Sequence, residues 1–99
     1  MEGKITYQFT SRIWKHDAPG GWYFASLPKD ISKEIRAQLK WQEQGWGRMT
    51  AVAIIDTYEW QTAIWFDTKL DTYLLPIKAE ARKNAHIALD EEIVISIRV

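Results

Sequence analysis

The chain has 99 residues, of which 46% are apolar and 26% are charged, and its 13 basic side chains balance its 13 acidic ones. This length predicts one domain, spanning residues 1–99, with a single hydrophobic core, and the composition excludes a disordered chain. Because cysteine is absent, a disulfide scaffold, a thiolate metal site and a cysteine nucleophile are excluded. The zero net charge argues against a nucleic-acid coat or a membrane-surface protein, which usually carry a net basic field.

The first residues lack the features of a secretion signal. Met1–Lys4 lead directly into an alternating segment, and no run approaches the 18 or so apolar residues of a membrane span. We therefore expect a cytoplasmic protein with no membrane partner.

The first third of the chain predicts a β-hairpin. Apolar and polar residues alternate from Lys4 to Ile13, which is typical of a strand with one solvent-facing side. Trp14 interrupts the alternation and predicts a bulge or the end of the strand. Ala18–Gly21 has turn chemistry, so Trp22–Leu27 should return as the partner strand.

A short helix should follow this hairpin. Asp30 can cap its start, and Ile31, Ile35 and Leu39 form an apolar stripe at a spacing of four residues. Gly45 marks the region where the helix should end.

The second half of the chain predicts four more strands. Met49–Ile55 is apolar on both faces, which favours a central strand, and Asp56–Glu59 links it to another strand at Trp60–Phe66. A polar loop at Asp67–Asp71 separates these from a short strand at Thr72–Leu75. The last strand is Ile93–Val99, where apolar residues again alternate with polar ones.

A second helix is predicted between the last two strands. Pro76 suits its first turn, the helix should run to about Ala85, and Ile77 and Ala81 should face inward. Together, six strands and two short helices predict a mainly β fold, a compact and largely antiparallel β-barrel. A two-layer α+β sheet is the alternative.

Lys78 and Arg82 lie four residues apart on one face of this second helix. Such a like-charge pair costs about 0.2–0.5 kcal/mol. A cation in the first turn, where Lys78 is expected, is disfavoured by roughly 0.3–1 kcal/mol. Their stabilising partner should therefore lie outside the helix: either an internal carboxylate, or a bound anion held together with the helix amides. The candidate carboxylates are Asp56, Asp67, Asp71 and Asp90.

The six tryptophans are many for so small a domain. Most can be core residues, but six buried indoles would each need a partner for their N–H group. Trp41 and Trp46 flank a polar segment outside any periodic strand, so we expect them to be partly exposed at a pocket mouth or a dimer contact. Gly45 and Gly47 favour a helix end and a strand start over a ligand-binding loop.

Groups for catalysis or metal binding are few. His16 and His86 are the only histidines, and neither stands in a recognisable relation to a serine or carboxylate partner. Their spacing does not suggest a metal site. We therefore predict no catalytic residue, no metal and no cofactor.

From Trp22 onward the chain resembles a bacterial family of small domains of unknown function, which also occurs ahead of bacteriocin-protection-type domains. The second half carries the more specific matches. The matching residues are Trp22–Phe24, Leu27–Pro28, Gly45–Gly47, Trp60–Thr62, Tyr73–Lys78, Arg82–Lys83 and Asp90 with the strand that follows it.

The resemblance implies a closed six-stranded Greek-key barrel with a short helix before the last strand, and no established reaction, cofactor or ligand. The recurrent polar positions of the family correspond here to Thr62, Lys78 and Arg82. Two positions depart from the family pattern. Ala63 replaces the usual serine and so lacks its hydroxyl, and Leu89 replaces the usual glycine before a turn.

The leading functional hypothesis is a non-enzymatic binding module for a small anionic ligand. Its site would contain Lys78 and Arg82, with Thr62 and either Trp46 or Trp60 nearby. The alternative is a structural or protein-interaction domain, such as a homodimer that uses Trp41 and Trp46 as apolar anchors. An enzyme with Lys78 or a histidine as general base ranks third, and nucleic-acid binding ranks below these.

Overall fold

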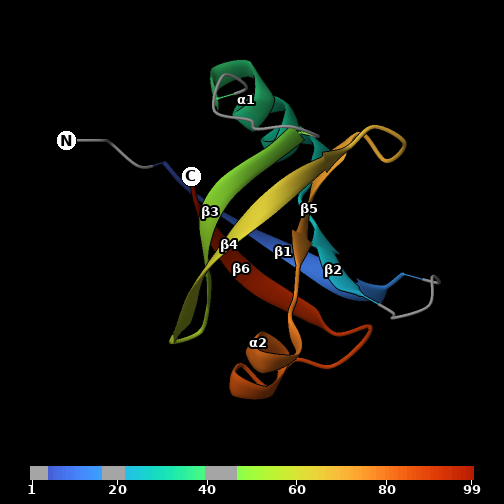
Figure 1. The fold of residues 1–99 in the computed structure, drawn as a ribbon, viewed down its shortest axis with the longest axis vertical. Helices are drawn as coiled ribbons and strands as arrows, with labels where there is room; N and C mark the ends of the chain where they lie inside the picture. Colours follow the sequence, from blue (N-terminus) through green and yellow to red (C-terminus); the bar gives the residue numbers. More distant parts are fainter. Residues whose placement is uncertain (1–4, 17–21, 40–46) are drawn as a thin grey trace.

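The described residues fold into a closed antiparallel barrel (Figure 1). The structure is a computed structural model, and it describes residues 5–16, 22–39 and 47–99. Its elements are β1 (Thr6–Lys15), β2 (Tyr23–Ser26), α1 (Lys29–Leu39), β3 (Arg48–Ile55), β4 (Tyr58–Asp67), β5 (Thr72–Pro76), α2 (Ala79–Asn84) and β6 (Glu92–Arg98). The strands close in the order β1-β2-β5-β4-β3-β6, and every neighbouring pair is antiparallel. The predicted mainly β barrel is confirmed, and the two-layer alternative is wrong.

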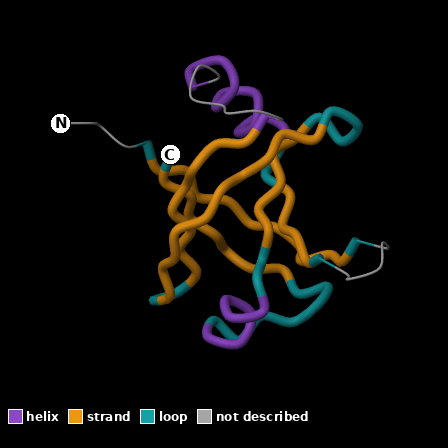
Figure 2. Tube along the Cα trace, in the orientation of Figure 1, coloured by secondary structure: helices purple, strands orange, loops and turns teal. Residues whose placement is uncertain are grey.

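The strand order differs from the sequence order at two places, and a helix accompanies each. β2 pairs with β5 rather than with β3, and α1 lies in the connection from β2 to β3. Similarly, α2 lies between β5 and β6, which are not neighbours. Figures 1 and 2 show the two helices at opposite ends of the barrel. Within the described residues, neither helix has the length and apolar character needed to cross a membrane.

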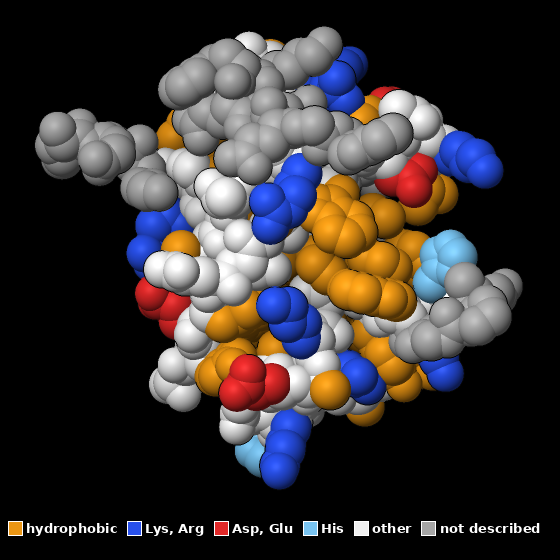
Figure 3. Space-filling model, in the orientation of Figure 1, with side chains coloured by type: hydrophobic (Ala, Val, Ile, Leu, Met, Phe, Trp, Pro, Cys, Tyr) orange, Lys and Arg blue, Asp and Glu red, His pale blue; other side chains and the backbone are white. Residues whose placement is uncertain are grey.

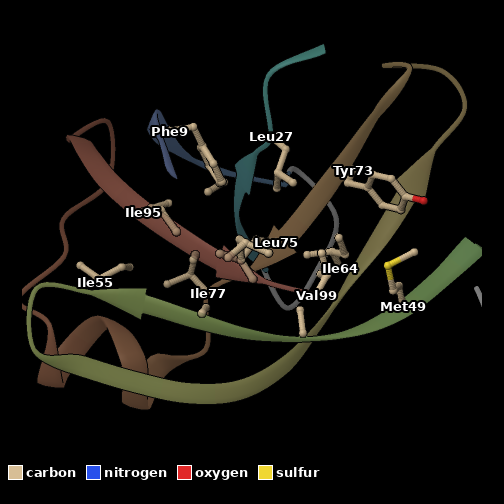
Figure 4. Packing of buried hydrophobic residues seen from close by; sticks show 14 of the residues in the cluster. Phe9, Leu27, Met49, Ile55, Ile64, Tyr73, Leu75, Ile77, Ile95 and Val99 are labelled. Atoms are coloured by element: carbon tan, nitrogen blue, oxygen red, sulfur yellow. The ribbon is translucent and has the colours of Figure 1, made fainter. Parts of the chain in front are cut away.

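The barrel interior is filled by alternate residues of the strands (Figure 4). In β3, for example, Met49, Ala53 and Ile55 are buried, whereas Thr50 between them is exposed. The helix α1 closes one end with Ile35 and Leu39, as its apolar stripe predicts. The core residues labelled in Figure 4 are Phe9, Leu27, Met49, Ile55, Ile64, Tyr73, Leu75, Ile77, Ile95 and Val99.

One polar group of α1 is buried among these apolar residues. The hydroxyl oxygen of Ser32 accepts a hydrogen bond of 3.0 Å from the backbone N–H of Tyr73 in β5. Ser32 is itself buried, so this bond satisfies a group that would otherwise be costly to desolvate. It also fixes the position of α1 against the barrel.

Three local predictions are wrong. Trp14 does not end its strand, because β1 continues to Lys15 and Trp14 pairs with Phe24 of β2. Pro76 does not begin the second helix: it is the last residue of β5, also opposite Phe24, and α2 starts at Ala79. Pairing across the barrel overrides the local preferences in both cases. Asp30 lies in the first turn of α1, since the helix already begins at Lys29.

Strand β3 has β4 and β6 as neighbours, as every strand of a closed barrel has one on each side, but its outer face is only partly covered. Val52 and Ile54 are half-buried, so the expected burial on both faces is incomplete. The predictions for Ala18–Gly21, Trp41, Gly45 and Trp46 lie outside the described residues.

Candidate functional site

The outer face of the sheet formed by β2, β5 and β4 is apolar. Phe24 and Leu74 are each only 7% exposed, yet they do not belong to the barrel core. Their strand neighbours Ala25 and Leu75 do belong to it, so Phe24 and Leu74 point to the opposite side of the sheet. A second apolar layer therefore lies outside the barrel, on strands whose outer side would ordinarily be polar.

Three tryptophans cover this layer. The ring of Trp14 lies 5.2 Å from that of Phe24, and the ring of Trp22 stacks on Phe24 at 6.5 Å with 17° between the planes. Trp65 lies 6.3 Å from Trp22 at a tilt of 44°. The indole N–H of Trp14 donates a hydrogen bond of 2.9 Å to the hydroxyl of Ser26. We call Trp14, Trp22, Phe24 and Trp65 the outer aromatic layer.

Part of the outer aromatic layer is open to solvent. The side chain of Trp22 is 54% exposed, and that of Trp65 is 38% exposed. Figure 3 shows hydrophobic atoms gathered over β4, β5 and β2, with lysine and arginine side chains beside them. Clustered exposed aromatic area of this kind is typical of a surface that contacts a ligand or a partner.

A cleft of about 320 Å³ runs along the edge of this layer. Its position follows from the register, because Arg48 of β3 lies directly opposite Trp65 of β4, and Pro76 and Lys78 follow at the end of β5. We call this cavity the outer cleft. Its described lining residues are Trp22, Arg48, Gln61, Thr62, Ala63, Trp65, Pro76 and Lys78.

The outer cleft is positively charged. Arg48 and Lys78 line it, and none of the described lining residues is acidic. In the described part of the chain Lys78 takes part in no ion pair. The ion pairs Arg12–Glu92 at 3.3 Å and Arg98–Glu59 at 3.7 Å involve none of the described residues that line the cleft. An anion entering the cleft would meet the ammonium group of Lys78, which no described carboxylate pairs with.

Lys78 is placed by the end of β5 rather than by a helical turn. It is the N-cap residue of α2, with an extended backbone (φ −68°, ψ 158°), and its side chain makes no capping hydrogen bond. The helix has only six residues, so its dipole adds little at this position. The expected location of Lys78 in the first turn is therefore wrong, but its unpaired charge remains.

Arg82 lies outside the outer cleft and stacks on an aromatic ring. Its guanidinium carbon is 3.7 Å from the ring centre of Tyr23, which Lys15 also approaches at 5.9 Å. The Nε atom of Arg82 is buried and has no hydrogen-bond partner. Among the described residues, no carboxylate forms an ion pair with Arg82 or Lys78, so the internal salt bridge is wrong there.

The proposed carboxylate partners occupy turns. Asp56, Asp71 and Asp90 have positive φ angles of 54°, 59° and 66°, which aspartate tolerates better than most residues. The carboxylate of Asp67 accepts a hydrogen bond of 2.9 Å from the backbone N–H of Leu70. These residues shape loops and leave the two cations unpaired.

Of the other predicted site residues in the described part of the chain, one lines the outer cleft and one does not. Thr62 is half-buried and lines the outer cleft, whereas Trp60 packs against the barrel core and stacks on Tyr58 at 5.4 Å. Trp46 lies outside the described residues. The structure thus brings Thr62 and Lys78 together and leaves Arg82 and Trp60 outside this cleft.

Gly47 supports the start of β3 beside the cleft. Its φ angle is +71°, and an added Cβ would lie 3.2 Å from the Cβ of Phe66. The close backbone approach therefore serves packing against β4, in agreement with the strand-start interpretation.

Sequence reasoning missed Trp22, Trp65, Arg48 and Gln61. A usable signal was present, because the residues around Trp22 and Leu74 are apolar at both odd and even positions. That pattern indicates strands covered on both sides. With the barrel filling one side, the other side must carry a second apolar layer.

A comparison with protein families identifies the chain's relatives. A family model described as a domain of unknown function, DUF1905, matches residues 9–97. The chain belongs to the DUF1905 family. The match also includes most of β1, so the resemblance noted from Trp22 onward extends to the first strand of this DUF1905 domain. No curated protein matches the chain.

Proposed function

We propose that this DUF1905 domain is a non-enzymatic binding module for a small anionic ligand, which occupies the outer cleft. The observation that carries the proposal is the charge of the cleft: Lys78 and Arg48 line it, Lys78 forms no ion pair with the described residues, and no described lining residue is acidic. An unpaired cation such as Lys78 at a concave surface raises the local concentration of anions.

The size and chemistry of the cleft support a small ligand. A volume of about 320 Å³ is at the lower end of the range of ligand sites. Gln61 can add hydrogen bonds that orient the anion, and Thr62 also lines the cleft. The described lining offers no histidine or carboxylate as a general base, which favours binding over catalysis.

The proposal is tested by calorimetric titration with methyl phosphate and acetate at low ionic strength. Lys78→Met removes the charge and keeps most of the aliphatic stem, so we expect affinity to fall about tenfold, or about 1.4 kcal/mol. Lys83→Met is the matched control, because Lys83 is an exposed lysine of α2 that does not line the cleft. Equal losses in both variants, or no binding by the wild type, would contradict the proposal.

A second candidate is a protein-interaction domain, and the exposure of Trp22 and Trp65 favours it. The predicted homodimer anchors Trp41 and Trp46 lie outside the described residues, so the outer aromatic layer is the surface to examine. Light scattering at high micromolar concentration separates the two states. A dimer that becomes monomeric in Trp22→Lys would support this candidate, and a monomeric wild type would exclude the homodimer.

A further inference from the structure

The outer cleft combines its cations with exposed indole rings. We propose that its ligand is an aromatic anion: a planar ring that carries a phosphate or carboxylate group directly or through a short link. This inference rests on the proposed anion-binding function and adds the chemical class of the ligand.

The first argument is the availability of the indole faces. Trp22 stacks on Phe24 through one side at 17°, and with 54% of its side chain exposed it offers its other side to solvent. Trp65 is tilted by 44° from Trp22, so the two rings do not cover each other. Two indoles held at an angle beside a cleft can contact a flat ring by stacking and by an edge-to-face approach.

The second argument is preorganisation. The carbonyl of Trp22 accepts a backbone hydrogen bond of 2.8 Å from His16, and its ring rests on Phe24. Trp65 lies within β4, where it pairs with Arg48 on one side and Leu74 on the other. Because both rings are held before any ligand arrives, little conformational entropy is lost when one binds.

The third argument is the strand register, which places a basic side chain next to an indole ring. Arg48 and Trp65 are directly opposite each other on adjacent strands and both point outward, so their Cβ atoms lie about 4.5–5.5 Å apart. Lys78 lines the same cleft, two residues beyond Pro76. A ligand that uses both features must therefore carry its anionic group close to its ring.

The volume of the outer cleft further limits the class of ligand. About 320 Å³ accommodates one ring system with one charged group rather than several linked rings. The 13 basic and 13 acidic side chains of the chain balance, so its net charge does not favour a nucleic-acid strand over a small anion. A small aryl phosphate or aryl carboxylate fits both observations.

The experiment compares three phosphate esters by calorimetric titration: methyl, cyclohexyl and phenyl phosphate. All three carry the same anion, and only the last has a π face. We expect phenyl phosphate to bind about tenfold more tightly than methyl phosphate. It should bind about threefold more tightly than cyclohexyl phosphate, which offers similar apolar area without a π face.

Two variants assign the effect to the indoles. In Trp22→Leu the ratio of phenyl phosphate affinity to methyl phosphate affinity should fall from about ten to near one. Trp65→Leu provides a second test if the first variant folds poorly, as judged by its thermal melt. In NMR titrations of the wild type, the indole N–H signals of Trp22 and Trp65 should shift, and that of the core-packed Trp60 should not.

The outcomes distinguish an error in the ligand class from an error in the proposed anion-binding function. If all three esters bind equally and Lys78→Met weakens all of them, the inference is overturned and the proposed anion-binding function stands. If no ester binds, both are overturned. If short oligonucleotides bind much more tightly than phenyl phosphate, with a steep dependence on salt, the ligand class is wrong and a nucleic-acid strand replaces it.

Discussion

Two cavities of similar size differ in how their positive charges are balanced. The α1 cavity, of about 340 Å³, is lined by Lys29, Asp30, Lys33, Arg36, Phe66 and Asp71. It thus contains three cations and two carboxylates, whereas the described lining of the outer cleft contains two cations and no carboxylate. A group of basic side chains is therefore not in itself a sign of a ligand. The informative feature is a cation, Lys78, that forms no ion pair with the described residues in a cleft whose described lining has no carboxylate.

The aromatic rings of the two cavities also differ, in how much of each ring the protein covers. In the α1 cavity the guanidinium of Arg36 lies 3.9 Å above the ring centre of Phe66, so one face of that ring is covered by the protein. In the outer cleft, Trp22 and Trp65 keep large exposed fractions. The α1 cavity places carboxylates among its cations and a guanidinium over its ring, whereas the outer cleft leaves Lys78 without an ion pair among the described residues and its two indoles exposed.

The largest loss of phosphate affinity should come from a substitution that introduces a carboxylate into the outer cleft. Lys78→Glu replaces an attraction with a repulsion, so we expect methyl phosphate affinity to fall at least about thirtyfold, or roughly 2 kcal/mol. Lys78 is exposed at the end of a strand, and the unfolding free energy should change little. Calorimetry and a thermal melt measure both quantities. Retained binding would show that the anion does not enter this cleft.

The next prediction concerns Arg82, which stacks on Tyr23 outside the outer cleft and should therefore affect stability and not binding. Arg82→Ala removes a cation–π contact worth about 0.5–2 kcal/mol. It should therefore lower the unfolding free energy, which a urea titration measures, and leave phosphate affinity nearly unchanged. Lys83→Ala, an exposed neighbour on α2, is the control for helix propensity. Lost binding with normal stability would instead place Arg82 in the binding site.

A smaller effect should appear when the α1 cavity is made to resemble the outer cleft. The double variant Asp30→Asn and Asp71→Asn removes both carboxylates and keeps their shape, and asparagine tolerates the φ of 59° at position 71. We expect a weak new phosphate site, detectable as shifts of the backbone amide signals around Lys33 in NMR spectra at low salt. If these signals do not move, charge balance alone does not distinguish the two cavities.

The barrel itself was largely predictable from the sequence, because the inward residues of each strand follow a period of two and strands dominate the chain. Element boundaries were less accurate where a cross-strand partner mattered. Trp14 and Pro76 both lie opposite Phe24, and no local pattern reveals that shared neighbour.

The candidate site was only partly predictable, for a related reason. Lys78 was predicted because its charge is unfavourable at the start of a helix. Thr62 was predicted because it matches a recurrent polar position of the family. Arg48 and Trp65 belong to the outer cleft because β3 and β4 pair in one register, and Trp22 reaches it from the residue just before β2. Such a site is made by the tertiary arrangement, and it becomes visible when the outer side of each strand is examined as well as the inner side.

The smallest effect concerns position 63, where the family pattern has a serine and this chain has alanine. Ala63 lines the outer cleft and is only 5% exposed, so a hydroxyl there would lie at the base of the site. Ala63→Ser should strengthen methyl phosphate binding about threefold, because a neutral hydrogen bond contributes about 0.5–1.5 kcal/mol. Thr50→Ser, which keeps the hydroxyl and removes only a methyl group from the paired residue of β3 outside the cleft, is the control. An unchanged affinity would mean that the anion sits nearer to the cleft mouth, between Lys78 and Arg48, and does not reach the strand surface below them.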